Sequence, residues 1–115
     1  MLGDLNVPAK LKNQNRFKST VFHALSDPIR LEILSYLRDG EKCVCEIVPR
    51  LDLIQPLVSR HLKILRERRM VQSERHGTVV IYSLADRRII EALDLLRAAM
   101  RDMLAQRAAL VEMLE

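Results

Sequence analysis

The apolar residues of this sequence change their spacing near Met70, and this change narrows the possible folds more than any other feature. Before it, the stretch QPLVSRHLKILRERR (55–69) has apolar residues three and four positions apart, which predicts an amphipathic helix. After it, MVQSERHGTVVIYSLAD (70–86) contains two β-rich runs that meet at His76 and Gly77. Since glycine accepts the positive φ of a tight turn, the sequence predicts a helix followed directly by a β-hairpin.

Helical spacing also marks the segments on either side. In DPIRLEILSYLRDG (27–40), Asp27 can cap a helix, Pro28 suits its first position and Gly40 can end it. QNRFKSTVFHALSD (14–27) and CEIVPRLD (45–52) predict two further helices.

From Asp86 to the end, no glycine or proline interrupts a helical pattern. The predicted order is therefore four helices, a hairpin and a last helix. A short helix followed by a basic helix and a hairpin is typical of a winged helix-turn-helix. We expect a mainly α fold with a small β-hairpin. Residues 1–12 would form a flexible arm, and residues 13–115 one DNA-binding and dimerisation domain.

Positive charge gathers on the predicted helix-turn-helix and hairpin. Residues 55–77 hold six cations and two carboxylates, a net charge of +4, and the whole chain has a formal charge of +4. Gln can pair with adenine, and Arg with guanine or phosphate. The candidate DNA contacts are Gln55, Ser59, Arg60, His61, Lys63, Arg66, Arg75 and His76. A solvated basic face is the alternative, but its coincidence with this element order favours double-stranded DNA as a partner.

Several other classes of protein are disfavoured. No apolar run approaches the roughly 18 residues that a membrane span needs, and the first residues lack a signal-peptide core. We therefore expect a cytoplasmic protein with no membrane partner and with reduced thiols. No set of nucleophile, base and orienting residue suggests an enzyme.

The last helix carries an apolar stripe with coiled-coil spacing. A helix of about 28 residues would be about 42 Å long, more than a core of this size can cover. Packing on its own domain is the alternative, but the length favours a homodimer. The candidate interface residues are Ile89, Leu93, Leu96, Met100 and Met103, together with Phe17 and Phe22 of the first predicted helix.

The two cysteines, Cys43 and Cys45, lie one residue apart in EKCVCEIVPRL (41–51). Free cysteines often pack as small buried apolar residues. A mutual disulfide would close a tight ring between residues two apart, so we expect it to be disfavoured. The third interpretation is a site for a soft ion, since thiolates select such ions. On a helix the two side chains would point to nearly opposite sides, so a shared ion requires an extended or distorted segment.

Four pieces of the sequence resemble the ArsR/SmtB family of metal-responsive repressors. They are LSDPIRLEIL, CVCE, QPLVSRHLKILRE and HGTVVIYSL, in the family's order between about residues 24 and 84. The resemblance implies a homodimer that blocks a palindromic operator until an inducer releases it, and it implies no catalysis.

The resemblance also places two thiolates of an arsenite or antimonite site on Cys43 and Cys45, with no cofactor required for folding. Two positions depart from the family pattern. Val48 stands where some relatives carry a third cysteine, and Ile54 stands where a Ser or Thr usually caps the recognition helix. A regulator that answers redox chemistry or another metal, or a protein-interaction adaptor, remains an alternative.

Overall fold

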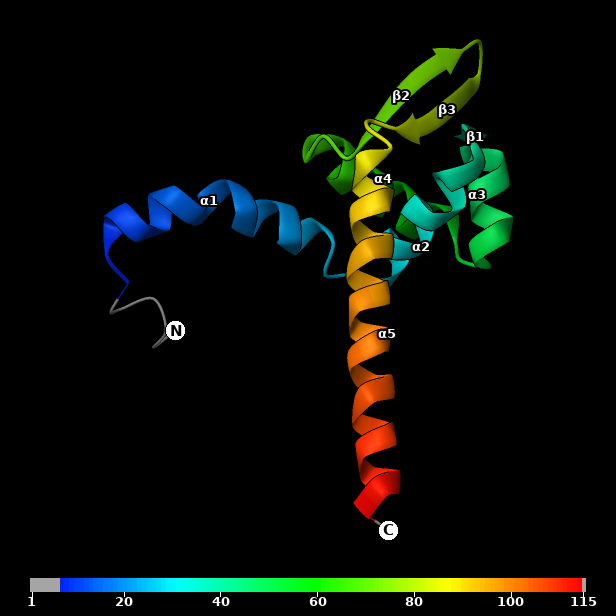
Figure 1. Ribbon diagram of the computed structural model, residues 1–115. Helices are drawn as coiled ribbons and strands as arrows, with labels where there is room; N and C mark the ends of the chain where they lie inside the picture. Colours follow the sequence, from blue (N-terminus) through cyan, green and yellow to red (C-terminus); the bar gives the residue numbers. More distant parts are fainter. Residues whose placement is uncertain (1–6, 115) are drawn as a thin grey trace. The chain divides into compact units, whose positions relative to one another are not determined.

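The computed structural model describes residues 7–114 of the 115-residue chain. Its elements, in chain order, are α1 (Ala9–Ala24), α2 (Pro28–Tyr36), a 3-10 helix (Leu37–Asp39), β1 (Lys42–Cys43), α3 (Val44–Leu51), α4 (Gln55–Glu67), β2 (Val71–His76), β3 (Val79–Leu84) and α5 (Arg88–Leu114). The predicted mainly α fold with a β-hairpin, the winged helix-turn-helix, is confirmed (Figure 1). The described residues fall into two compact units, one that ends at Ala85 and one that begins at Asp86, and each is described by itself. The single domain over residues 13–115 stays a prediction.

Helix α2 begins where the sequence predicted, whereas α1 begins earlier than expected. An Asp27 carboxylate oxygen accepts hydrogen bonds from the backbone N–H groups of Ile29 (2.8 Å) and Arg30 (3.3 Å), as the sequence predicted for the start of α2. By contrast, α1 begins at Ala9 and so includes the end of the predicted arm, where the sequence showed no sustained period. Residues 1–6 of that arm lie outside the described residues.

The core of the first unit is aliphatic and lies where α2, α3 and α4 pack together. Its fully buried side chains include Ile33, Leu34, Ile47, Val58, Leu62 and Leu65. All six lie on the apolar faces of their helices, so the spacing of apolar residues determines which face of α4 is buried. The opposite, polar face of α4 is left to solvent.

A three-stranded antiparallel sheet has the order β1-β3-β2 (Figure 1). Strands β2 and β3 form the hairpin after α4, whereas β1 precedes α3. His76 pairs with Val79, so the turn comprises Gly77 and Thr78, one residue later than predicted. Gly77 has φ 65°, the left-handed conformation that the sequence assigned to it. The sequence missed β1, whose residues Lys42 and Cys43 pair with Tyr82 and Ile81 of β3. Two residues are too few to produce a periodic pattern.

The second unit is α5, a helix of 27 residues. Asp86 lies just before it and accepts a hydrogen bond from the backbone N–H of Arg88 (2.9 Å). The Arg88 guanidinium also binds this carboxylate (2.7 Å), and these hydrogen bonds lower the pKa of Asp86 to about 2. None of the helices in residues 7–114 is long and apolar enough to cross a membrane.

Candidate nucleic-acid interface and thiol pair

The two faces of α4 differ sharply in chemistry. Val58, Leu62 and Leu65 are fully buried. The predicted contacts on α4 that are exposed to solvent are Gln55, Ser59, Arg60, Lys63 and Arg66. Among these residues, Lys63 makes an ion-pair contact with Glu67 at 4.0 Å, and an exposed pair of this kind is weak. The first three turns of α4 therefore present donors and cations on one open face.

The hairpin adds a second basic surface. Arg75 and His76 are exposed at the end of β2, beside the turn. The His76 Nε2 atom lies 3.4 Å from a carboxylate oxygen of Glu74, so the wing tip holds one acidic group as well. Val79, 41% exposed, opposes His76 across the hairpin. These positions suit contacts to a phosphate or a minor groove, as expected for a wing.

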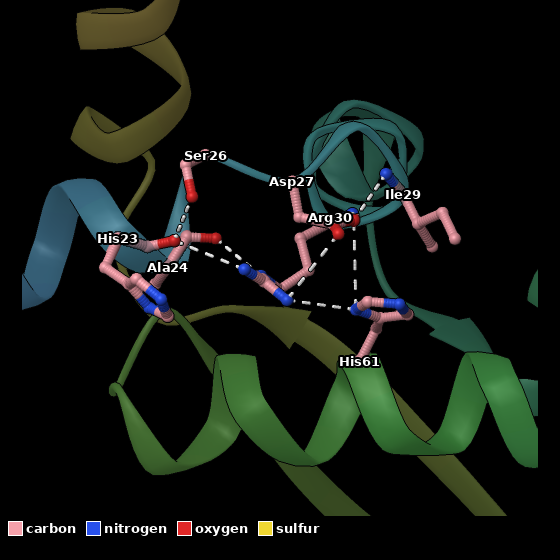
Figure 2. A network of polar contacts seen from close by, with 7 residues as sticks. All are labelled: His23, Ala24, Ser26, Asp27, Ile29, Arg30 and His61. Atoms are coloured by element: carbon pink, nitrogen blue, oxygen red, sulfur yellow. Dashed lines mark hydrogen bonds and ion pairs between the residues drawn. The ribbon is translucent and has the colours of Figure 1, made fainter.

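His61, which we predicted as a phosphate contact, is buried. It is 4% exposed, and its Nδ1 atom lies 3.1 Å from the Arg30 guanidinium (Figure 2). A buried ring cannot reach a phosphate, so this prediction is wrong and His61 leaves the set of DNA contacts. Because a guanidinium can only donate hydrogen bonds, Nδ1 of His61 is the acceptor.

Arg30 of α2 connects α4 to the end of α1 (Figure 2). Its Nε donates to the carbonyl of Ala24 (2.7 Å) and one terminal nitrogen donates to the carbonyl of His23 (3.2 Å), while the other faces His61. Arg30 is only 6% exposed. One buried cation therefore fixes three helices at a single point.

Asp27 supplies the negative charge near this cation. Its carboxylate lies 4.0 Å from the Arg30 guanidinium and 3.9 Å from His61 Nδ1. Partial burial tends to raise the pKa of Asp27, but the backbone hydrogen bonds from Arg30 and Ile29 and the neighbouring positive charge outweigh it and lower the pKa. Asp27 thus stays ionised and serves both as helix cap and as counter-charge.

The sequence contained a signal for this network that we did not use. Arg30 precedes Ile33 and Leu34 by three and four residues, and His61 precedes Leu65 by four. Residues at these separations share one face of a helix, so both polar side chains belong to buried faces. Two polar residues on facing apolar stripes predict a buried pair.

The cysteines lie at the junction between β1 and α3. Cys43 is extended, caps α3 and is 7% exposed, while Cys45 lies in the first turn of α3 and is exposed. The two are joined by a disulfide, which we had expected to be disfavoured. The expectation fails because only one of them is helical. Their Cα atoms are 5.1 Å apart, within the usual range for a disulfide.

A groove connects Cys45 to the candidate DNA-binding surface. It has a volume of about 460 Å³ and lies between α3, the start of α4 and the end of the wing. Val48 of α3, Gln55 and Ser59 of α4, and Val79 of β3 are among the residues that line it. Cys45 and two candidate base-contacting residues, Gln55 and Ser59, therefore border one space.

The predicted dimer residues are largely open to solvent. Phe17 is 79% and Phe22 63% exposed on α1. On α5, Leu96, Met100 and Met103 are about half exposed, while Ile89 and Leu93 are partly buried. Large apolar side chains exposed in such numbers usually mark an interaction surface.

A helix-turn-helix formed by α3 and α4, followed by a β-hairpin, defines the class of winged-helix regulators. The family model described as "Bacterial regulatory protein, arsR family" matches residues 27–73. A regulator from Methanocaldococcus jannaschii, named as an uncharacterized HTH-type transcriptional regulator, is 40% identical over 76 residues, which are 65% of this chain and 85% of that protein. The chain belongs to the arsR family, which comprises transcriptional regulators and not enzymes.

Other relatives carry more specific names. The HTH-type transcriptional repressor SmtB of Mycobacterium tuberculosis is 47% identical over 66 residues, 57% of this chain and 49% of that protein. The arsenical resistance operon repressor of Staphylococcus xylosus is 39% identical over 66 residues, 57% of this chain and 64% of the relative. The chain spans about half the length of the SmtB relatives that it matches.

Solved structures share this fold. HlyU from Vibrio cholerae has a TM-score of 0.67 and 31% identity, covering 72% of this chain and 94% of that one. A winged helix-turn-helix domain from Mycobacterium bovis, described as homodimeric, has a TM-score of 0.72 with 23% identity, covering 84% of this chain and 90% of its own. At 23% identity, the likeness to the Mycobacterium bovis domain is evidence for the fold alone.

Proposed function

We propose that this protein is a DNA-binding transcriptional repressor that uses α4 as its recognition helix. The observation that carries the proposal is the two-faced character of α4. Its apolar face is anchored by fully buried side chains, while Gln55, Ser59 and Arg60 stand free on the other face. Residues near the start of a recognition helix reach base edges, so these three contact bases in the major groove. Lys63 and Arg66 contact phosphates, and Arg75 and His76 contact the backbone or minor groove from the wing.

The repressor acts as a homodimer on a near-palindromic operator. Phe17 and Phe22 on α1 and the exposed apolar residues of α5 supply the interface. The likeness of this fold to a domain described as homodimeric supports the same arrangement. A two-fold dimer presents two copies of α4, which then contact half-sites about 34 Å apart.

The inducer is a trivalent arsenic or antimony species bound by Cys43 and Cys45. The two sulfurs meet because the cysteines lie on different secondary structures, so one ion can reach both. The residues fit such a ligand as a pair of soft donors, provided that they are reduced to thiolates. A relative named as an arsenical resistance operon repressor supports the choice of ligand.

Release from DNA follows by linkage between the two sites. Cys45 borders the same groove as Gln55 and Ser59, and α3 packs against α4. A ligand that requires another arrangement at the start of α3 therefore favours a state that binds DNA less well.

The disulfide favours a second candidate function, a repressor controlled by oxidation of the same pair. Both functions use Cys43 and Cys45, but they differ in the signal. Oxidant alone would release the operator in the redox case. In the metalloid case, only the reduced protein would respond, and oxidation would block the response.

The decisive measurement is operator binding by fluorescence anisotropy, with a sequence selected from a random library. We expect specific binding that weakens steeply with salt, and Arg60→Ala should reduce specific binding more than non-specific binding. Arg101→Ala, an exposed arginine of α5, is the matched control. Arsenite should release the reduced protein but not the Cys43→Ser or Cys45→Ser variants. Failure to select any sequence, with little dependence on salt, would support a protein-interaction adaptor instead.

A further inference from the structure

Ile54 is a large apolar side chain on the surface that the proposed function assigns to DNA. It is 69% exposed and comes immediately before Gln55, the first residue of α4. Apart from α1, the described part of the first unit exposes two other large apolar side chains, Leu31 and Val79. Single exposed apolar residues are ordinary on protein surfaces, so the position of Ile54 is more informative than its exposure.

The backbone of Ile54 belongs to the first turn of α4. Its carbonyl accepts hydrogen bonds from the backbone N–H groups of Leu57 and Val58, each at 3.2 Å. Ile54 precedes the fully buried Val58 by four residues, a separation that would bury it on a continuous helix. Its own backbone is extended instead, with φ −71° and ψ 145°, and its side chain lies in solvent. A stiff β-branched side chain is therefore fixed at the leading end of α4 and is open to a partner.

The neighbour of Ile54 indicates which partner suits it. Gln55 can pair with the N6 and N7 atoms of adenine in the major groove. The thymine of the same base pair carries a 5-methyl group in that groove, and apolar side chains recognise this group by contact. Residues around the start of a recognition helix reach base edges. Ile54 has no donor for a phosphate, so a thymine methyl group at this or the adjacent base pair fits it best.

We propose that Ile54 is a specificity-determining residue that contacts a thymine 5-methyl group in each half of the operator. This inference rests on the proposed function and adds to it a base contact made without hydrogen bonds. Gln55 and Ile54 then read complementary features of A·T pairs, the hydrogen-bonding edge of adenine and the methyl group of thymine. A serine at position 54 would cap α4 but would offer no comparable apolar contact.

The test uses the full-length protein with reduced thiols, on the operator selected from a random library. Each thymine of a half-site is replaced in turn by deoxyuridine, which lacks only the 5-methyl group, and binding is measured by fluorescence anisotropy. At the thymine that Ile54 contacts, we expect binding to weaken about fourfold, which corresponds to the roughly 0.8 kcal/mol of one buried CH2 group. Replacement in both half-sites should weaken binding about fifteenfold, because two such contacts are lost.

Ile54→Ser separates recognition from folding. This variant should bind the thymine and deoxyuridine operators equally well, while its free energy of unfolding rises because serine caps α4. A purely structural role for Ile54 would instead lower the free energy of unfolding and leave the thymine preference intact. Ile54→Val keeps a shorter apolar side chain and should retain part of the preference.

Val79→Thr is the matched control. Val79 is also exposed and β-branched, but it lies beside the turn of the wing. The proposed function places the wing at the DNA backbone or the minor groove, and the thymine methyl group lies in the major groove. Val79→Thr should therefore keep the wild-type preference for thymine over deoxyuridine.

The outcomes separate this inference from the proposed function. If no specific operator can be selected, the proposed function fails and this inference fails with it. If a specific operator exists but every deoxyuridine replacement is neutral, or its half-sites contain no thymine, DNA recognition stands and the role of Ile54 is wrong. If Ile54→Ser keeps the wild-type preference for thymine, another residue reads the methyl group and the assignment to Ile54 is overturned.

Discussion

Replacing Arg30 with methionine tests the buried network most directly. The change keeps a long unbranched side chain but removes every hydrogen-bond donor of the guanidinium. Arg30 is 6% exposed, and it donates to the carbonyls of Ala24 and His23 and to His61 Nδ1. Methionine removes the Arg30 donor from all three acceptors. The His23 carbonyl keeps its hydrogen bond from the Ser26 hydroxyl (2.7 Å), but Ala24 and His61 are buried.

The expected cost follows from the two buried acceptors. A buried group left without its partner costs about 1–3 kcal/mol, so two such groups cost about 2–6 kcal/mol. We therefore expect Arg30→Met to lower the free energy of unfolding by about 2–6 kcal/mol. This is a large part of the 5–15 kcal/mol typical of a domain.

Urea denaturation followed by circular dichroism at 222 nm gives the free energy of unfolding. All variants are measured at one protein concentration, because the stability of a dimer depends on concentration. Arg16→Met, on the exposed surface of α1, is the control, with an expected change below about 0.5 kcal/mol. Combining Arg30→Met with His61→Leu should cost less than the sum of the single changes, by about 1 kcal/mol or more. A loss below about 1 kcal/mol for Arg30→Met, or strict additivity, would refute the account of this network.

Three further predictions concern the helix caps and the wing. Folding lowers the pKa of Asp27, so its contribution to the free energy of unfolding is fully present above the unfolded pKa of about 4 and is lost as pH falls through the folded pKa. Asp27→Asn keeps a helix cap but removes the charge. It should flatten the pH dependence of the free energy of unfolding in urea titrations between pH 2 and 6. Ile54→Ser should raise the free energy of unfolding by about 1 kcal/mol, since α4 has no side-chain cap; no change in the urea midpoint would contradict this. Arg75→Ala should weaken operator binding and reduce its salt dependence by about one phosphate contact, whereas an unchanged slope would place the wing off the DNA.

Caps and local periodicity made most of the elements predictable. Asp27 and Pro28 specified the start of α2, and Asp86 the start of α5, because capping depends on residues adjacent in the chain. The apolar stripe of α4 identified the face that is buried, and hence the face open to a partner. The end of α4 was placed two residues too far, because Arg68 and Arg69 continue a charge pattern that does not specify where hydrogen bonding ends.

Features that depend on contacts between distant segments were harder to predict. Strand β1 exists only because Lys42 and Cys43 reach β3, about 40 residues later in the chain. His61 was assigned to DNA because its type and its place on a basic helix suit a phosphate. The side chain instead contacts Arg30, 31 residues earlier. Local spacing places each of the two side chains on a buried helix face, but only the packing of α2 against α4 brings them together.

The sequence by itself determined the order of the helices and the hairpin, the basic face of α4 and the likeness to the arsR family, since each depends on residue type and short-range spacing. The tertiary structure determined the contacts of three residues, His61, Cys43 and Cys45. It turned His61 inward because Arg30 of α2 lies there. It brought Cys43 and Cys45 together because Cys43 is extended in β1, paired with β3, while Cys45 lies in the first turn of α3. It also joined Cys45, Gln55 and the wing around one groove, an arrangement that only the packing of α3, α4 and β3 can produce.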